Sequence, residues 1–231
     1  MYGKHAVVAA MQNPFRKIYK IYCTQRIYEK YSLLIQKFQF EIKDNGFISQ
    51  ILKHDNHQGI IANLKTIYHK KFIASECKKE KFIVILDQMQ DSQNIGAIIR
   101  SANAFNIRHF ITTIHNTPCE NGLLARAAAG CLEYSQIYMI PNVNQILHIL
   151  KKLGFWVVGL SNESSFDKLS DIVNIEKLVL VIGSESNGIR PLVLKNCDFR
   201  VRIPISSKIE SLNASNAASI AFYHFSKSLF Q

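Results

Sequence analysis

The sequence predicts an α/β protein in which the C-terminal two thirds form a mostly parallel sheet covered by helices. Fully apolar runs of strand length occur at Phe82–Leu86 and Leu178–Ile182. Similar strand patterns recur along this region, and stretches with helical spacing separate most of them. Helices cover both faces of a parallel sheet, so its strands are buried on both sides and read as continuous apolar runs.

The first 68 residues predict a smaller α/β unit, because short helical patterns alternate with short strand patterns. The expected elements are helices at 5–11 and 47–54 and strands at 17–23 and 59–64. Residues 69–81 follow with five lysines and no apolar period, so we expect a linker there.

Residues 82–231 carry the stricter pattern and predict one larger domain. The expected strands are 82–87, 109–114, 135–140, 155–160, 177–182 and 198–203. The expected helices are 95–105, 121–132, 143–153, 190–196 and 214–229. In open α/β sheets, ligands bind beyond the carboxyl ends of the strands, so the loops at those ends are candidate sites.

Positive charge is concentrated in the N-terminal third of the chain. The formal net charge is +11; residues 1–81 contain 15 Lys and Arg against 6 Asp and Glu, and residues 82–231 contain 13 against 11. A basic unit joined to a nearly neutral one predicts that the basic part contacts a polyanion such as nucleic acid. A solvated lysine-rich surface is the alternative explanation.

Several classes of protein are disfavoured. The five cysteines are dispersed and form no CxxC pair, and His54 and His57 lack a recognisable third metal ligand, so we expect neither a disulfide framework nor a metal site. The start lacks a signal-peptide core and no apolar run is long enough to span a bilayer, so we expect a cytoplasmic protein. The sequence contains no GxGxxG and no GxxxxGK[ST], which argues against a nicotinamide-dependent dehydrogenase and a P-loop NTPase.

Two loops that follow predicted strands carry unusual polar residues. In LDQMQDSQNIGAIIRSANAF, Asn94 lies near the start of a helix and Arg100 follows about one and two-thirds turns later. In LVLVIGSESNGI, an apolar strand runs directly into Gly183 and Glu185. An arginine paired with a nearby carboxylate and an ordinary surface turn are the plain alternatives.

A third loop, IPISSKIESLNASNAASIAFYHF, crowds small polar residues where an apolar helix begins. Helix capping needs only one such residue, yet Ser211, Asn213, Ser215 and Asn216 all occur within one and a half turns. Because all three loops follow strands, they can converge at one edge of a parallel sheet. The surplus of polar groups suggests that some are kept for a ligand.

The three loops resemble the motifs of the SpoU class of RNA 2′-O-ribose methyltransferases in the SPOUT superfamily. NIGAIIR resembles the first motif, GSESNG the second and IPISSKIESLNAS the third. The resemblance covers the chain from about Phe82 onward. HQGI, residues 57–60, also resembles members with an L30e-like RNA-binding domain. The chain departs from the family pattern at Asp91-Ser92 and near Asn106, Ser186 and Asn216.

This resemblance implies a trefoil-knotted α/β domain at residues 82–231, an L30e-like RNA-binding domain at 1–68 and a homodimer formed through the knotted domain. The cofactor would be S-adenosylmethionine, held by Gly183, Ile203 and Leu212. The catalytic residues carried over from the family are Asn94, Arg100, Glu185, Ser211 and Asn213.

The implied reaction is methylation of a ribose 2′-hydroxyl in RNA, with a guanosine of large-subunit ribosomal RNA as the favoured target. Because a guanidinium stays protonated in proteins, we expect Arg100 to grip a phosphate or stabilise the developing alkoxide rather than act as a base. A tRNA ribose methyltransferase and a non-catalytic RNA-binding protein of the same fold remain alternatives.

Overall fold

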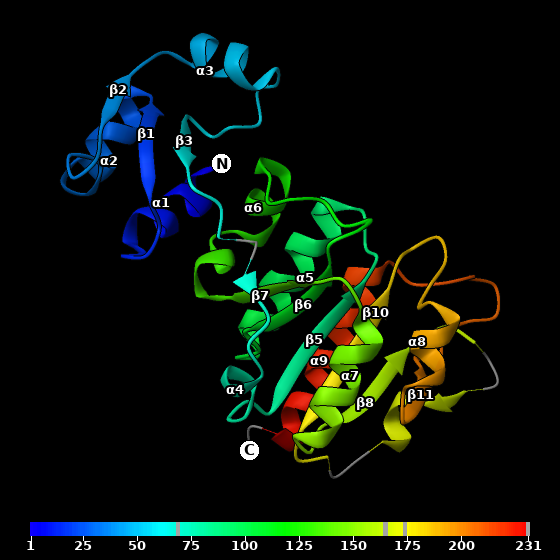
Figure 1. The fold of residues 1–231 in the computed structure, drawn as a ribbon. Helices are drawn as coiled ribbons and strands as arrows, with labels where there is room; N and C mark the ends of the chain where they lie inside the picture. Colours follow the sequence, from blue (N-terminus) through cyan, green and yellow to red (C-terminus); the bar gives the residue numbers. More distant parts are fainter. Residues whose placement is uncertain (68–69, 164–165, 173–174, 230–231) are drawn as a thin grey trace.

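The computed structural model describes residues 1–67, 70–163, 166–172 and 175–229 and contains two sheets (Figure 1). The larger has eight strands in the order β4-β7-β6-β5-β10-β8-β11-β9, and every pair of neighbours is parallel. The smaller has three strands in the order β2-β1-β3. This arrangement confirms the predicted parallel sheet with a small N-terminal α/β unit.

The strands of the large sheet are β4 (Lys70–Lys71), β5 (Phe82–Asp87), β6 (His109–Thr113), β7 (Gln136–Ile140), β8 (Trp156–Leu160), β9 (Asp167–Lys168), β10 (Leu178–Gly183) and β11 (Phe199–Arg202). Its helices are α4 (Ala74–Cys77), α5 (Ser92–Ala104), α6 (Gly122–Ala128), α7 (Val143–Lys152), α8 (Pro191–Lys195) and α9 (Ala214–Leu229), with 3₁₀ turns at Cys131–Tyr134 and Leu169–Asp171. The six predicted strands are confirmed to within one or two residues.

Two helices differ from the prediction at one end. Helix α5 begins at Ser92, before the expected residue 95, because the side chain of Asp91 accepts from Gln93 N at 2.7 Å and caps it there. Helix α6 ends at Ala128, before the expected residue 132, because Ala129 and Gly130 take φ angles of 50° and 96°. Left-handed backbone cannot continue a right-handed α-helix.

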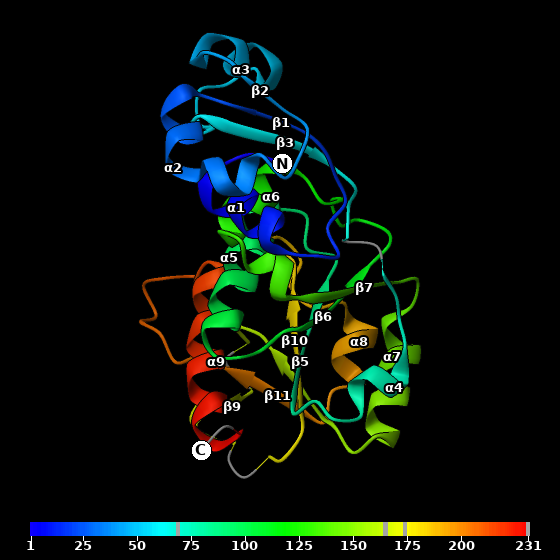
Figure 2. The ribbon, with the colours of Figure 1, turned by 90° about the vertical axis from the view of Figure 1, so that its left-hand side faces the viewer.

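Helices cover both faces of the large sheet. In Figure 2 the sheet lies between α5 and α9 on one side and α7 and α8 on the other. Strand β5 shows why residues 82–86 are all apolar: Val84 packs in the cluster with α5 and α9, and Ile85 packs in the cluster with α7. No helix of the described residues is both long and apolar enough to cross a membrane.

The N-terminal unit contains α1 (Lys4–Gln12), β1 (Ile18–Cys23), α2 (Gln25–Ile35), β2 (Phe40–Ile42), α3 (Asn45–Leu52) and β3 (Ile60–Leu64). Strand β1 pairs parallel with β2 and antiparallel with β3. The elements predicted around α1, β1, α3 and β3 are confirmed, whereas α2 and β2 are additional to the prediction.

The segment expected to be a linker is partly packed against the large sheet. Strand β4 pairs with β7, which makes Lys70–Lys71 an edge of that sheet. Cys77 of α4 is fully buried, and this burial raises the pKa of its thiol to about 11. The first residue of the segment, His69, lies outside the described residues. The domain limits and the knot stay predictions.

The two units contact each other through the start of the chain. Ala6 of α1 belongs to the same apolar cluster as Leu124 of α6. The ring of Tyr2 lies so close to Gly122 that a β-carbon there would come within 2.2 Å of it. Only glycine therefore fits at the start of α6 without moving Tyr2.

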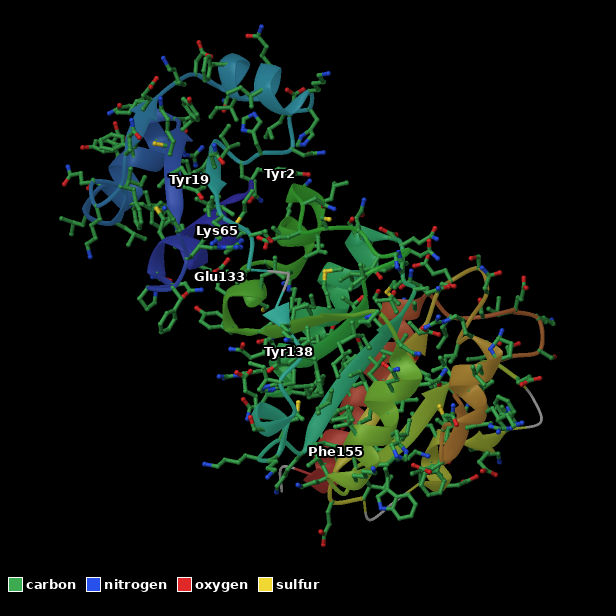
Figure 3. All side chains as sticks on the ribbon, in the orientation of Figure 1. Tyr2, Tyr19, Lys65, Glu133, Tyr138 and Phe155 are labelled. Atoms are coloured by element: carbon green, nitrogen blue, oxygen red, sulfur yellow. The ribbon has the colours of Figure 1, made fainter. Side chains whose placement is uncertain are left out.

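A buried charge cluster also joins the two units. The buried side chain of Arg16 forms ion pairs with Glu120 and Glu133 of the large unit. It also donates to the backbone oxygen of Lys65 at 2.9 Å, and Figure 3 shows Lys65 and Glu133 at the junction. Burial disfavours the charged forms of Glu120 and Glu133, and it raises the pKa of Glu133. Burial also acts to raise the pKa of Glu120, but hydrogen bonding and electrostatic attraction from Arg16 outweigh it and hold that pKa below its usual value.

Candidate active site

The loops after β5, β10 and β11 meet at the carboxyl ends of these strands, as the sequence predicted. A half-open cavity of about 650 Å³ lies there, lined by residues 160–163, 182–189 and 210–214 together with Leu194, Ile203, Ile205 and Ala217. Pockets for small ligands typically measure about 300–1,000 Å³. The cavity therefore has room for a nucleoside-sized ligand.

The loop after β10 forms a tight turn at the edge of this cavity. Ser184 N donates to Gly188 O at 3.1 Å, and Gly188 N donates to Ser184 O at 2.9 Å. A β-carbon on Gly183 would lie 2.0 Å from the carbonyl carbon of Gly188. Glycine at 183 is thus required by the close approach of the returning backbone.

An ion pair between buried Asp87 and half-exposed Arg190 anchors the far end of this loop. Asp87 ends β5, is fully buried and lies beside Gly183 in the sheet register. It accepts from Arg190 N at 3.0 Å, from Arg190 Nε at 2.9 Å and from Arg190 Nη2 at 2.6 Å. Such charge-assisted hydrogen bonds fix the geometry of both partners, so β5 holds residues 183–190 in place.

Asn94, Glu185 and Asn213 form one hydrogen-bonded network, although they come from three distant segments: the first turn of α5, the loop after β10 and the loop before α9. Asn94 Nδ2 donates to Glu185 Oε1 and, at 3.0 Å, to Asp91 Oδ2. Asn213 Nδ2 donates to Asn94 Oδ1 at 3.0 Å. The buried amide of Asn94 thus joins two residues that lie 91 and 119 positions further along the chain. The predicted convergence of the three loops is confirmed.

The crowd of small polar residues at α9 is partly explained by capping. Asn213 Oδ1 accepts from Ser215 N at 2.9 Å and from Ser215 Oγ at 2.6 Å, and the backbone oxygen of Asn213 accepts from Ala217 N. Asn213 therefore caps α9 while its amide nitrogen serves the network. Ser211 is exposed and lines the cavity two residues before this cap.

Arg100 lies apart from the network. It is exposed on α5, six residues after Asn94, which corresponds to about 9 Å of rise and about 240° of rotation. Burial raises the pKa of the Cys131 thiol, and the positive charge of Arg100 partly opposes that rise. Among the described residues the side chain of Arg100 has no hydrogen bond or ion pair, so the structure does not support the alternative of a carboxylate-paired arginine.

The residues expected to hold a cofactor all line the cavity. Gly183, Ile203 and Leu212 come from three different segments, and the last two are half-buried apolar side chains. Apolar side chains with a few polar groups around them suit a flat, polar-edged base. Over the ranges that the structure describes, no group of three or more His, Cys, Asp or Glu is arranged to hold a metal ion.

Asp87 and Arg190 were not among the predicted site residues. The available signal was an acid that ends an apolar strand and an arginine that follows a predicted glycine turn. The two residues are 103 positions apart, and neither local pattern pairs them.

Two family profiles together cover most of the chain. The profile of the SpoU rRNA Methylase family matches residues 81–223. A second profile, described as RNA 2′-O ribose methyltransferase substrate binding, matches residues 1–68.

Two bacterial relatives extend this similarity. The chain is 32% identical over 194 residues to an uncharacterized tRNA/rRNA methyltransferase of Borreliella burgdorferi, covering 79% of this chain and 84% of that one. It is 29% identical over 233 residues to the 23S rRNA (guanosine-2′-O-)-methyltransferase RlmB of Coxiella burnetii, covering 96% of this chain and 93% of that one.

The fold is shared with a solved SpoU methyltransferase. The AviRb enzyme from Streptomyces viridochromogenes, in complex with the cofactor AdoMet, matches with a TM-score of 0.82 at 19% identity, covering 98% of this chain and 88% of that one. From the two profiles and a relative above 30% identity, the chain belongs to the SpoU rRNA methylase family and is an S-adenosylmethionine-dependent RNA methyltransferase.

Proposed function

We propose that this protein methylates a ribose 2′-hydroxyl in RNA, with a guanosine of large-subunit ribosomal RNA as its target, in the cytoplasm. The observation that carries the proposal is the network of Asn94, Glu185 and Asn213 at the edge of a nucleoside-sized cavity. The N-terminal profile and the named relative from Coxiella burnetii favour ribose chemistry and ribosomal RNA. The excess of positive charge in residues 1–81 favours an RNA-binding N-terminal unit.

S-adenosylmethionine supplies an electrophilic methyl group when bound, and Gly183, Ile203 and Leu212 would hold it. The ribose hydroxyl is a weak nucleophile, so the protein must orient it and compensate the charge that develops on it. Glu185 is exposed, and Asn94 fixes one of its two carboxylate oxygens. The other oxygen would accept a hydrogen bond from the ribose, and Ser211 and Asn213 would complete the pocket.

Arg100 would bind the phosphate next to the target ribose or stabilise the developing alkoxide. A guanidinium is a rigid fork that matches phosphate geometry and does not deprotonate. Because Arg100 is exposed and does not line the cavity of its own chain, we infer that it serves the cavity of a second copy in a homodimer. Exposed Ile220 and Tyr223 on α9, which packs beside α5, favour a protein interface on this side of the molecule.

A mixing experiment tests this arrangement. Arg100→Ala and Glu185→Ala chains are each expected to be inactive as homodimers. Their heterodimer, purified through two different tags, keeps one cavity served by both residues and should recover up to about half of the wild-type methyl transfer. No recovery would contradict supply of Arg100 by the partner, and an active monomer would contradict the dimer.

Tritium transfer from labelled S-adenosylmethionine tests the substrate. Unmodified large-subunit ribosomal RNA should accept methyl groups at one ribose, which mapping should identify as that of a guanosine. Transfer to tRNA alone would support a tRNA enzyme, an option raised by the tRNA/rRNA names of several relatives. Cofactor binding without transfer to either RNA would support a non-catalytic RNA-binding protein. Glu185→Ala is the control for contaminating activity.

A further inference from the structure

A second cavity lies in the N-terminal unit, outside the candidate active site. It has a volume of about 570 Å³ and is formed by α2, α3, the start of α1 and the loop that contains HQGI. Three cations, Lys4, Arg26 and Lys30, line it against one acid, Asp55. Within the described residues none of these cations forms an ion pair with a carboxylate, whereas other lysines of the same unit are paired with Glu41.

The HQGI loop has an unusual backbone that shapes this cavity. Gln58 and Gly59 have φ angles of 56° and 75°, and a β-carbon on Gly59 would come within 2.8 Å of the Thr24 hydroxyl. Gln58 Oε1 accepts from Lys4 N at 2.8 Å and ties the loop to the start of α1. The loop thus holds the starts of α1 and α2 around one opening.

Buried His57 leaves the hydroxyl of Ser49 free to donate a hydrogen bond into the cavity. Gly59 N donates to His57 Nδ1 at 3.0 Å, so the ring proton sits on Nε2 and is donated to Ser49 Oγ at 3.0 Å. Burial lowers the pKa of His57, which agrees with a neutral ring. Because Ser49 Oγ accepts from the ring, its own proton can be donated to a ligand. His57 therefore acts by positioning Ser49.

The groups around the cavity match one ligand chemistry. The three cations suit phosphate oxygens, while the Ser49 hydroxyl, the Asn45 amide and the Asp55 carboxylate supply the donors and acceptors that a base edge needs. Proteins read RNA sequence mainly through unpaired nucleotides whose bases are turned out of the helix. The volume admits a whole nucleotide rather than a phosphate alone.

We propose that this cavity binds one unpaired nucleotide of the RNA substrate, with Arg26 and Lys30 on its phosphates and Asn45 and Ser49 on its base. The proposal rests on the proposed RNA methyltransferase function and adds a recognition site separate from the reacting ribose. Arg26, Lys30 and Asn45 are exposed, so replacing them leaves the core of the unit intact.

The test measures RNA affinity as a function of salt for the full-length protein, with an unmodified large-subunit ribosomal RNA transcript as the probe. The Arg26→Ala/Lys30→Ala variant should bind at least about tenfold more weakly. The slope of log affinity against log salt concentration should fall in magnitude by about one to two units, because the variant makes fewer phosphate contacts and binding therefore releases fewer counterions. Asn45→Ala should weaken binding without changing that slope. The matched control Lys17→Ala/Lys37→Ala removes two exposed charges outside the cavity and should have a smaller effect on affinity and slope.

Cross-linking locates the contact directly. A transcript that contains 4-thiouridine should cross-link to peptides of residues 24–30 and 45–59. Equal RNA affinity of the Arg26→Ala/Lys30→Ala variant and its control, or cross-links confined to other segments of the N-terminal unit, would overturn this site while methyl transfer by the wild-type protein still upheld the proposed function. A wild-type protein that neither bound nor methylated RNA would overturn both.

Discussion

Replacing Gly183 by alanine should distort the cavity proposed to bind the cofactor, while the rest of the fold is retained. Gly183 lies where β10 enters the turn that lines the cavity. Its position leaves no space for a side chain, because the atoms that a β-carbon would meet belong to the backbone of Gly188 and Ile189. Backbone atoms cannot rotate away as the end of a flexible side chain can.

The size of the effect follows from this geometry. The added carbon would lie 2.0 Å from the carbonyl carbon of Gly188 and 2.2 Å from Ile189 N. Ordinary contacts between carbon atoms measure about 3.5–4.0 Å, so the turn must move by about 1.5 Å. Overpacking of this kind costs about 1–3 kcal/mol in the free energy of unfolding. A similar loss at the displaced turn should weaken S-adenosylmethionine binding by about tenfold or more.

Two assays on the same protein check this reasoning. Urea denaturation measures the free energy of unfolding, and titration calorimetry measures the cofactor dissociation constant. Gly46→Ala is the matched control, because its β-carbon would meet only Asp44 Oδ1 at 3.4 Å. That variant should be unchanged or more stable by up to about 1 kcal/mol. A Gly183→Ala protein with wild-type stability and wild-type cofactor affinity would refute the argument.

Three further outcomes are expected. Arg16→Met leaves two buried carboxylates without their cation and should lower the free energy of unfolding by about 3–5 kcal/mol in urea denaturation; a loss below about 1 kcal/mol would contradict the buried cluster. Asn94→Asp removes the donor to Glu185 and adds a like charge, so methyl transfer should fall by about 10–100-fold with the fold retained by circular dichroism, and full activity would contradict the network. Burial raises the pKa of Cys197 to about 12, which leaves about one thiolate in 10⁴ at pH 8, so iodoacetamide should label exposed Cys119 first by mass spectrometry; equal rates would contradict this burial.

The central strands of the large sheet were predictable because they are buried on both faces and therefore consist of consecutive apolar residues. Along β5 each side chain is buried on one face or the other, so residues 82–86 are all apolar and only Asp87 at the end is polar. Short elements carry no such signal. Strand β2 has three residues and β4 has two, and β4 is held in place by pairing with β7 rather than by a pattern of its own.

Helix α2 was missed for a different reason. Only Ile27 and Ile35 of this helix are buried, and Tyr31 departs from helical geometry with φ −127° and ψ 23°. Its apolar residues Ile27, Tyr31, Leu34 and Ile35 nevertheless recur at helical spacing and pack into the small core, so the period was present in the sequence and the prediction overlooked it.

The site residues were predictable where polar side chains stand in a loop directly after a predicted strand. The pairing of two particular side chains was not predictable. Asn94, Glu185 and Asn213 each lie beside the cavity because parallel strands bring their exits to one edge. The Asp87–Arg190 pair could not be read in the same way, because the three-dimensional fold alone brings its members together.

One departure from the family pattern has a local physical explanation. Asn106 stands near a position where the family usually has glycine, and its φ angle is 59°. Asparagine is among the few residues that adopt left-handed backbone routinely, so the turn after α5 is kept without glycine.

The buried Arg16 cluster fixes the distance between the two cavities of the molecule. A side chain that water does not reach fixes how the basic N-terminal unit sits on the catalytic sheet, so the protein sets the span from the second cavity to the methyl-transfer site. With a nucleotide in the second cavity, as proposed above, an RNA would be selected by the spacing between that nucleotide and its target ribose. Lengthening that stretch of RNA by one nucleotide would move the ribose out of reach.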